Sequence, residues 1–412
     1  MLVYIKQQLS STRNARKYAR VLVRLVTIAI LLWILLFNVY TLLFKLQVVE
    51  NSKNHEILTL NLTPPKIIDS KSLDFYNKIQ RRSYDVNCKS LIEWDEAETQ
   101  KAKRILHKLR PNNNNKLIPL LSDSNFIFNE SQCELFKTLR GYNSHVVTDF
   151  EIKFPLAFII LTYNNVEQFE RLLRVIYRPQ NVYCIHVDSK SSHEFMMAVR
   201  SISKCFKNVF ITTKLERIVY ASFTRLKADI NCMVDLTASN KSAHPNLYDK
   251  SFDANWKYLI NVASTEFPLR TNYELTKILN MFNGANDIEV ITNFPKERIQ
   301  YKWKVKRNEG TTQEYMVRTK IIKNDIPHNY TIVKGIAYCT FSRQFVDYAL
   351  NNVYAKNLLK WSVDTYSPDE WYWATLQYNT QFNPPGGFRG ILTTHRIFSK
   401  FSLILIRQAD YH

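Results

Sequence analysis

The stretch PLAFIILTYNNVEQFERLLRVIYRPQNVYCIHVD, residues 155–188, contains the pattern that decides the fold. Residues 155–162 form an apolar run of strand length, which is typical of a strand buried on both faces. Apolar side chains then recur at helical spacing over 166–176, and Pro179 ends this predicted helix. Residues 181–188 form a second apolar run that ends in an acid. The stretch therefore predicts a strand–helix–strand unit.

The segments that follow continue the alternation of strands and helices. The pattern predicts strands at 208–213, 256–262, 288–292 and 331–341. It predicts helices at 192–205 and 222–236, a helix that begins with a capping box of Thr271 and Glu274, and a helix that begins at Arg343. Strands joined through helices make right-handed crossovers and a mostly parallel sheet, so the predicted fold class is α/β. Ligands of such sheets bind beyond the carboxyl ends of the strands. His186 and Asp188 lie at one such end.

A different pattern occupies the N-terminus. Residues 1–24 are basic, whereas residues 25–44 (LVTIAILLWILLFNVYTLLF) contain no charge. A helix over 25–44 would span roughly 30 Å, the thickness of the hydrocarbon core of a bilayer. The basic flank keeps the N-terminus on the cytosolic side. The sequence therefore predicts a single-pass signal anchor at 25–44, a lumenal stem over 45–130 and a folded lumenal domain over 131–412.

The formal net charge of +20 has two interpretations. Basic side chains in a lumenal domain bind phosphate-bearing donors such as nucleotide sugars, or they form a solvated surface. In a cytosolic protein the same charge would indicate nucleic-acid binding. Because the predicted topology places the domain in a lumen, we expect no nucleic-acid partner.

The cysteines and the glycosylation sequons all follow the predicted membrane span. The six cysteines are an even number in an oxidising compartment, which indicates disulfides but leaves their connectivity open. None forms a C-x-x-C pair, so a zinc ribbon is not expected. The N-x-[S/T] sequons begin at Asn61, Asn129, Asn240 and Asn329.

Residues 367–370, Ser-Pro-Asp-Glu, offer a carboxylate that is a candidate for catalysis. In one interpretation they begin a helix, with Ser367 as N-cap, Pro368 in the first helical position and Glu370 completing a capping box. In the other interpretation the carboxylate faces a cleft, and the aromatic residues 371–373 form a wall on which a sugar stacks. Dense aromatic residues more often belong to a core, so the local sequence favours the helix start.

Six segments in sequence order carry a resemblance to a known family. They are RLLRVIYRPQNVYCIHVD (171–188), IVYAS (218–222), ADINCM (228–233), NWKYLIN (255–261), EFPLRTN (266–272) and DTYSPDE (364–370). Over about residues 133–387 the chain closely resembles the core-2/I-branching β-1,6-N-acetylglucosaminyltransferases. The resemblance implies a GT-A-like nucleotide-sugar fold in a Golgi type II membrane protein.

The resemblance also implies a reaction. The expected activity is the inverting transfer of GlcNAc from UDP-GlcNAc, in β-1,6 linkage, to a galactose- or GalNAc-containing O-glycan of a glycoprotein. Glu370 matches the catalytic base of the family, which takes the proton of the acceptor hydroxyl. Asp188 and the neighbouring His186 are the donor-side candidates, although His186 has simple packing as its alternative. The acceptor-side positions, for which a solvated surface is the alternative, are Glu289, Lys296 and Arg298.

Independence from a divalent metal is a further implication of the resemblance. The chain contains no Asp-x-Asp pair of the kind that holds a cation against a diphosphate, and Asp287-Ile-Glu289 is the nearest look-alike. Basic side chains must then neutralise the leaving UDP. We expect no metal cofactor. The family disulfides correspond to Cys133–Cys205 and Cys184–Cys232.

The chain departs from the family pattern after Gly387. There the family continues through an acceptor-binding aromatic segment, a disulfide pair and an arginine-bearing strand to a lysine that binds the diphosphate. Residues 397–401, IFSKF, resemble the last piece and make Lys400 the candidate, whereas the alternative is an unrelated tail. Two other functions stay open: a catalytically inactive glycan- or partner-binding protein, and a transferase of the same fold that uses UDP-glucose or UDP-xylose.

Overall fold

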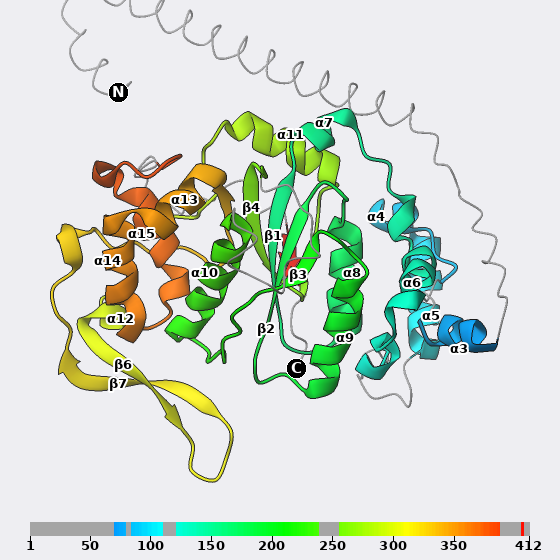
Figure 1. The fold of residues 1–412 in the computed structure, drawn as a ribbon, viewed down its shortest axis with the longest axis horizontal. Helices are drawn as coiled ribbons and strands as arrows, with labels where there is room; N and C mark the ends of the chain where they lie inside the picture. Colours follow the sequence, from blue (N-terminus) through cyan, green and yellow to red (C-terminus); the bar gives the residue numbers. More distant parts are fainter. Residues whose placement is uncertain (1–69, 80–83, 110–120, 239–254, 388–404, 408–412) are drawn as a thin grey trace, which may run out of the picture. The chain divides into compact units, whose positions relative to one another are not determined.

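A five-stranded sheet lies at the centre of the fold in the computed structural model (Figure 1). Its order is β3-β2-β1-β4-β8; the first four strands are parallel, and β8 pairs antiparallel with β4. The strands are β1 Leu156–Thr162, β2 Val182–Val187, β3 Val209–Ile211, β4 Tyr258–Ala263 and β8 Thr340–Ser342. In the register, Ile159 of β1 lies between Cys184 of β2 and Asn261 of β4. The mostly parallel sheet confirms the predicted α/β fold.

The structure describes residues 70–79, 84–109, 121–238, 255–387 and 405–407. These residues all belong to one compact unit. The predicted membrane span, the sequons at Asn61 and Asn240, and Lys400 lie outside the described residues. Within the described ranges, every helix is too short or too polar to cross a membrane.

Helices cover both faces of the sheet (Figure 1). On one face lie α8 Val166–Ile176 and α9 His193–Lys204, and on the other α10 Phe223–Thr237, α13 Arg343–Asn351, α14 Val353–Trp361 and α15 Tyr372–Tyr378. Alternate residues of β1 supply the two cores, because Phe158 packs in one apolar cluster and Ile159 in the other. The apolar run at 155–162 is therefore buried on both faces, as predicted.

The remaining elements surround this framework. The helices are α3 Ser70–Ile79, α4 Cys88–Ile92, α5 Glu96–Leu109, α6 Cys133–Arg140, α7 Asp149–Lys153, α11 Asn272–Phe282 and α12 Glu297–Gln300. Short 3-10 turns occur at η2 Asp123–Phe126, η3 Glu130–Gln132, η4 Tyr142–Ser144, η7 Pro327–Asn329, η8 Ser362–Asp364, η9 Pro368–Glu370 and η10 Thr380–Phe382. A small antiparallel pair joins β5 Glu266–Pro268 to β9 Leu405–Arg407. The predicted capping box of Thr271 and Glu274 is confirmed at the start of α11.

Two predicted strands in the second half of the domain are wrong. Residues 288–292 make only an isolated bridge, between Ile291 and Lys334, and the predicted strand at 331–341 is reduced to the short β8. The apolar residues that suggested strands, such as Ile288 and Val333, are buried in the core without pairing in a ladder. Burial, and not strand pairing, explains their pattern.

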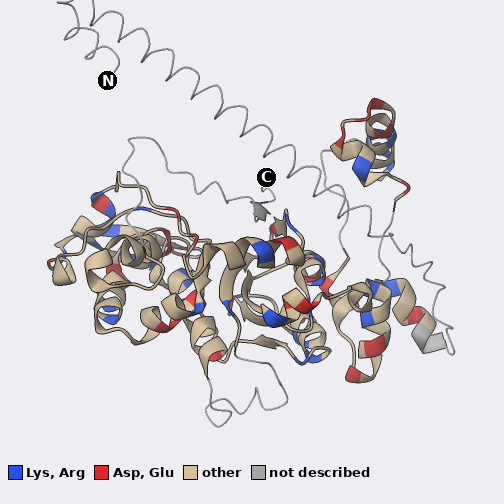
Figure 2. Cartoon of the chain, turned by 90° about the horizontal axis from the view of Figure 1, so that it is seen from above, with Lys and Arg blue, Asp and Glu red and all other residues tan. Residues whose placement is uncertain are grey.

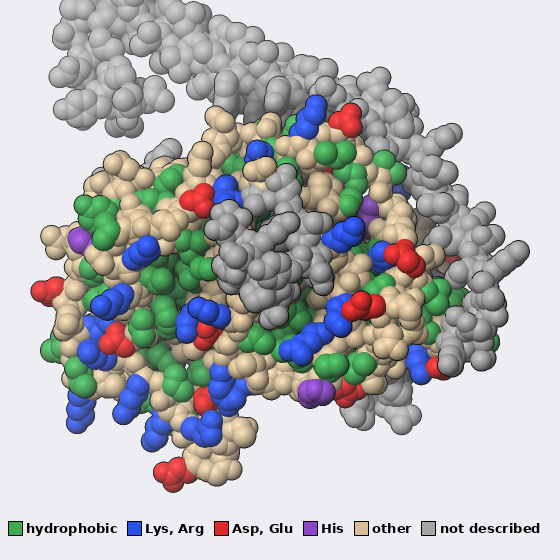
Figure 3. Space-filling view, in the orientation of Figure 1, with side chains coloured by type: hydrophobic (Ala, Val, Ile, Leu, Met, Phe, Trp, Pro, Cys, Tyr) green, Lys and Arg blue, Asp and Glu red, His purple; other side chains and the backbone are tan. Residues whose placement is uncertain are grey.

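A hairpin lies between the segments 288–292 and 331–341. It consists of β6 Tyr301–Arg307 and β7 Glu314–Ile322, which pair antiparallel. Lysines at 302, 304 and 306 alternate with less polar residues, a period of two that the sequence analysis missed. Lys and Arg side chains gather over this hairpin at the lower left of Figure 3, whereas basic and acidic residues are interspersed over the helices in Figure 2.

Two disulfides connect the framework. Cys133–Cys205 links the start of α6 to the end of α9, and Cys184–Cys232 links β2 to α10. These are the pairs that the resemblance implies. Cys88 is exposed and Cys339 is buried, and neither is disulfide-bonded within the described chain. Burial raises the pKa of the Cys339 thiol well above its ordinary value.

A buried ion pair attaches α3 and α6 to α8. The Arg140 guanidinium, only 1% exposed, donates to Glu170, which is fully buried, and to the Ile79 carbonyl at 2.9 Å. Arg174 also lies near Glu170, with 3.4 Å between Nε and Oε1. Loss of Arg140 would leave the Glu170 carboxylate in the core with only this more distant cation.

We expect Arg140→Ala to lower the free energy of unfolding by about 3–5 kcal/mol, because an uncompensated buried charge remains. The matched control is Lys78→Ala, which removes an exposed partner of Asp74 and should cost about 1 kcal/mol or less. Urea denaturation of the purified chain measures both values. Equal losses for the two variants would contradict the importance of the buried pair.

Candidate active site

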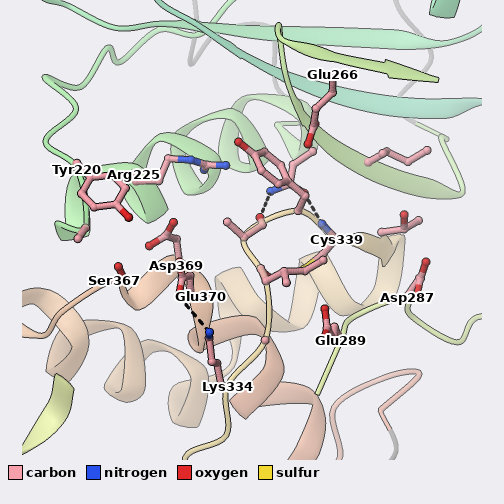
Figure 4. Close-up of a pocket in the computed structure, with 18 of the residues that line it drawn as sticks. Tyr220, Arg225, Glu266, Asp287, Glu289, Lys334, Cys339, Ser367, Asp369 and Glu370 are labelled. Carbon is pink, nitrogen blue, oxygen red and sulfur yellow. Dashed lines mark hydrogen bonds and ion pairs between the residues drawn. The ribbon is translucent and has the colours of Figure 1, made fainter. Parts of the chain in front are cut away.

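A cavity of about 530 Å³ lies beside β4. Its wall comes from the loop before α10, α10 itself, β4, the start of β5, residues 287 and 289, the segment 334–340 and the turn η9 with Ser367 before it (Figure 4). Titratable and polar residues dominate the lining: Tyr220, Arg225, Asn261, Glu266, Asp287, Glu289, Lys334, Tyr338, Ser367, Asp369 and Glu370. The predicted catalytic residue therefore lines a cavity.

The turn that carries Glu370 is not the predicted helix start. Ser367 has φ 45°, in the left-handed region, and its side chain makes no capping bond. Its N–H instead donates to the carbonyl of Ala221 at 2.7 Å, and Ala221 has φ 60°. Ser367 and Pro368 do stand at the predicted N-cap and first positions, but of the short turn η9, and helix α15 begins only at Tyr372. The capping box is wrong because this tertiary contact holds Ser367 in another conformation.

The carboxylate of Glu370 meets two cations on one side. Arg298 Nη1 donates to Glu370 Oε2 at 2.7 Å. Lys334 Nζ lies 3.9 Å from the same oxygen (Figure 4). Within the described residues, Oε1 accepts no hydrogen bond. The side chain is 31% exposed, so Oε1 is open to a ligand in the cavity.

Gly335 brings the backbone of the segment 334–340 against this turn. Its N–H donates to the Glu370 carbonyl at 2.6 Å. A Cβ at this position would lie 2.5 Å from the Glu289 carbonyl oxygen and 2.8 Å from Ala374 Cβ, so a larger residue would force the backbones apart. The glycine therefore sets the position of Lys334 and Glu289 in the cavity wall.

The three acceptor-side candidates occupy different positions. Glu289 lines the cavity, and Arg298 contacts Glu370 from outside the lining set. Lys296 is exposed in the N-cap position of α12 and does not line the cavity. Two of the three candidates are thus brought to Glu370 or its cavity, and Lys296 is not.

The donor-side candidates act on the loop before α10. Asp188 is 7% exposed, and its Oδ1 accepts from the N–H of Lys190 at 2.9 Å and of Ile218 at 3.3 Å. His186 is 1% exposed, and its Nε2 accepts from the N–H of Glu216 at 2.9 Å. Neither side chain lines the cavity, but the loop that they hold continues into Tyr220, which does.

The aromatic residues 371–373 are not a sugar-stacking wall. Trp371, Tyr372 and Trp373 are fully buried in the core beneath the site. The core interpretation of these residues holds. The aromatic side chains that line the cavity are Tyr220, which is 81% exposed, and Tyr338.

The sequence analysis missed several residues of the cavity. Tyr220, Asn261 and Asp369 lie inside the segments that carry the family resemblance, so a residue-by-residue examination of those segments would have found them. Arg225 and Lys334 lie outside those segments and had no signal. Asn261 is central, because its amide donates to Asp229 at 3.1 Å and its oxygen accepts from the Cys339 N–H at 2.7 Å.

Two other groups of residues bear on the expectations from sequence. Asn129 and Asn329 are both exposed, so the sequons at these positions are accessible. In the described ranges no group of three or more His, Cys, Asp or Glu side chains is arranged to hold a metal ion. Asp287 and Glu289 both line the cavity.

Comparisons with known proteins point to one family. The family model described as "Branch: Core-2/I-Branching enzyme" matches residues 156–398. The chain is 39% identical over 293 residues to the zebrafish beta-1,3-galactosyl-O-glycosyl-glycoprotein beta-1,6-N-acetylglucosaminyltransferase 4, with 71% of this chain and 64% of the relative covered. A human beta-1,3-galactosyl-O-glycosyl-glycoprotein beta-1,6-N-acetylglucosaminyltransferase is 36% identical over 313 residues, with coverage of 76% and 68%. The rat protein of this name numbered 3 is 38% identical, and 62% of its length is covered.

The burial of His186 makes the stability of the folded chain depend on pH. Desolvation lowers the pKa of this imidazole from its ordinary 6.5 to about 4, against the opposing effect of Asp188. Between about pH 4 and pH 6.5 the His186 side chain of the unfolded chain takes up a proton that the folded chain does not bind. Stability is therefore present in full above pH 6.5 and decreases as the pH falls through 4.

We expect the wild type to lose up to about 3 kcal/mol of unfolding free energy between pH 7 and pH 4 through His186 alone. His186→Gln should lack this part of the pH dependence, whereas His193→Gln, at an exposed position, should keep it. Urea denaturation at several pH values measures the difference. An unchanged pH dependence in His186→Gln would contradict a neutral buried imidazole.

Proposed function

Because this chain belongs to the Core-2/I-Branching enzyme family, we propose that it is an inverting glycosyltransferase with Glu370 as its general base. The proposed reaction transfers GlcNAc from UDP-GlcNAc, in β-1,6 linkage, to a galactose- or GalNAc-containing O-glycan. The printed names of the relatives support this choice of sugar and linkage. The matched relatives extend further than the chain, which covers 64% of the zebrafish protein and 62% of the rat protein.

One observation carries the proposal: Glu370 lines the cavity with one carboxylate oxygen that has no partner among the described residues, while cations hold the other oxygen. In the proposed reaction Oε1 takes the proton of the acceptor O–H. The acceptor oxygen bonds to the anomeric carbon as the bond from that carbon to UDP breaks on the opposite face. Inversion by this single displacement requires only one carboxylate.

The leaving UDP carries away the electron pair of the broken bond and needs positive charge nearby. We propose that basic side chains provide this charge without a divalent metal, with Lys400 as the candidate taken from the family pattern. The absence of an Asp-x-Asp pair from the sequence supports this part of the proposal.

Glu289 and Arg298 are the proposed contacts for the acceptor. Glu289 offers a carboxylate in the cavity wall, which suits hydrogen bonds from sugar hydroxyls. Arg298 orients the base, because its guanidinium holds Oε2 and leaves Oε1 for the acceptor. Lys296, which is exposed near this region, would contact an extended glycan from outside the cavity.

We place the enzyme in the Golgi membrane as a type II protein with a lumenal catalytic domain. The proposal rests on the apolar run at 25–44 with its basic flank and on the glycan-synthesis names of the relatives. A glycoprotein O-glycan in the same lumen is then the acceptor.

Glu370→Gln should lower kcat by about 10²–10⁴-fold, because a general base contributes this much to a proton-transfer step. The KM for UDP-GlcNAc should stay close to the wild-type value. Transfer to a core-1 acceptor, followed by product separation, measures both constants. Glu309→Gln, an exposed position on the β6–β7 hairpin, is the matched control and should keep wild-type activity. Full activity in Glu370→Gln would refute the assignment of the base.

Transfer should persist when EDTA is added, because the proposed site uses basic side chains where other GT-A-like enzymes use a cation. The measurement compares initial rates in EDTA with rates in added Mn²⁺ or Mg²⁺, for UDP-GlcNAc, UDP-glucose and UDP-xylose in parallel. We expect equal rates with and without metal and the highest rate with UDP-GlcNAc. Strict dependence on added metal would contradict the proposed leaving-group stabilisation.

A further inference from the structure

Arg225 and Asp369 are a second pair of charged residues at the cavity (Figure 4). Arg225 Nη1 donates to Asp229 Oδ2 at 2.7 Å. Its Nη2 is sealed from solvent and has no hydrogen-bond partner in the described part of the chain. The same is true of Asp369 Oδ1. An unpaired buried donor and an unpaired buried acceptor are thus found on two residues of one cavity.

The residues and the backbone around this pair are held in place by hydrogen bonds. Asp229, which is fully buried, receives hydrogen bonds from Arg225 and from the Asn261 amide, and Asn261 is in turn tied to the backbone at Ala337 and Cys339. On the other side, the Ala221–Ser367 hydrogen bond fixes the start of the turn that carries Asp369. The backbone that carries the two groups is thereby held in place, and a rotation of the two side chains exposes to a ligand the atoms that are otherwise closed to solvent.

Unpaired buried polar groups are costly, so the arrangement needs a ligand that satisfies both. A hydroxyl group both donates and accepts a hydrogen bond, and adjacent hydroxyls would match the Asp369 acceptor and the Arg225 donor. A free anion would be repelled by Asp369, and a free cation by Arg225. The pair therefore fits a neutral polyhydroxyl ring better than a phosphate or a metal ion.

The position of the pair favours the donor over the acceptor. Arg225 follows the loop that Asp188 and His186 hold at the carboxyl end of β2, and nucleotides bind at such strand ends. Arg298, a proposed acceptor-side contact, lies with Glu370. Consecutive carboxylates thus have different surroundings, with Asp369 toward Arg225 and Glu370 toward Arg298.

We propose that Arg225 and Asp369 bind hydroxyl groups of the pyranose ring of the donor and thereby determine which sugar is transferred. This inference rests on the proposed function and deepens it. The carboxylate of Asp369 accepts from one ring hydroxyl, and Nη2 of Arg225 donates to a neighbouring one. Burial raises the pKa of Asp369 to about 6, with Arg225 opposing the shift and Glu370 adding to it, which agrees with a carboxylate whose Oδ1 meets no partner among the described residues before the sugar enters.

The test combines variants of the full chain with donors that lack one hydroxyl. We compare UDP-GlcNAc with its 3-deoxy and 4-deoxy analogues and with UDP alone, by calorimetric affinity and, where transfer occurs, by KM. For the wild type, removal of the contacted hydroxyl should weaken donor affinity by about tenfold to a hundredfold, as expected for a charge-assisted hydrogen bond. UDP alone has no sugar ring, so its affinity should not depend on Arg225 and Asp369.

In Asp369→Asn, UDP-GlcNAc should bind more weakly by a similar factor, and the deoxy analogue should bind as well as UDP-GlcNAc does. Affinity for UDP and KM for the acceptor should stay within about twofold of the wild type, a margin well below the effect expected of one lost charge-assisted bond. Asp347→Asn, an aspartate that pairs with Arg343 on α13 away from the cavity, is the matched control and should behave as the wild type. If Asp369→Asn is poorly folded, Arg225→Lys replaces it, because it keeps the charge beside Asp229 but loses the second nitrogen.

The outcomes separate the two proposals. No loss of wild-type affinity for either deoxy donor, an equal loss for UDP, or a change confined to the acceptor KM would overturn the sugar site. If the wild type binds UDP-GlcNAc with the expected deoxy pattern but transfers nothing, the sugar site stands and the transferase function fails. If transfer occurs but the deoxy effect is unchanged in Asp369→Asn, the function stands and the sugar site fails.

Discussion

The hydrogen bond from the Ser367 N–H to the Ala221 carbonyl, 2.7 Å long, is the contact on which the rest of the site depends. Both residues have left-handed φ angles without being glycine, a conformation that costs on the order of 1 kcal/mol or more for each residue. The contact joins the loop before α10 to the turn η9. It brings Asp369 and Glu370 into the cavity wall, where a regular helix start would have used Glu370 as a cap.

Consecutive carboxylates in this turn meet different electrostatic surroundings. Glu370 is partly exposed and has Arg298 and Lys334 at one oxygen, so its charge is compensated while the other oxygen stays open. Asp369 has a buried oxygen that meets no partner among the described residues, and Arg225 is the cation that opposes the rise in its pKa. Two neighbouring residues of the same chemistry thus suit two tasks, a base for the acceptor and a hydrogen-bond acceptor for a sugar.

The sequence predicts what depends on local periodicity and loses what depends on long-range contacts. Strand β1, helix α8 and strand β2 follow directly from the spacing of apolar residues in 155–188. The local sequence favours a helix cap for Glu370, because no feature of residues 367–370 indicates that Ser367 donates a hydrogen bond to the distant Ala221. Arg225 likewise has no signal, since its role arises only when α10 lies beside η9. The false strands at 288–292 and 331–341 have the same origin, because apolar residues there are buried without pairing.

The β6–β7 hairpin, which the sequence did not reveal, also helps to position Arg298 beside Glu370. Helix α12, which carries Arg298, leads directly into β6, and the Arg298 carbonyl accepts from the Tyr366 N–H at 3.0 Å. The end of the hairpin nearest α12 is held to the same segment, because Trp303 packs against Tyr366 in a tilted arrangement with 4.6 Å between ring centroids and Lys323 pairs with Asp364. Arg298 is therefore positioned from both sides by the segment that precedes Glu370. The cation and the Glu370 carboxylate that it contacts are therefore connected, through this segment, to the hairpin.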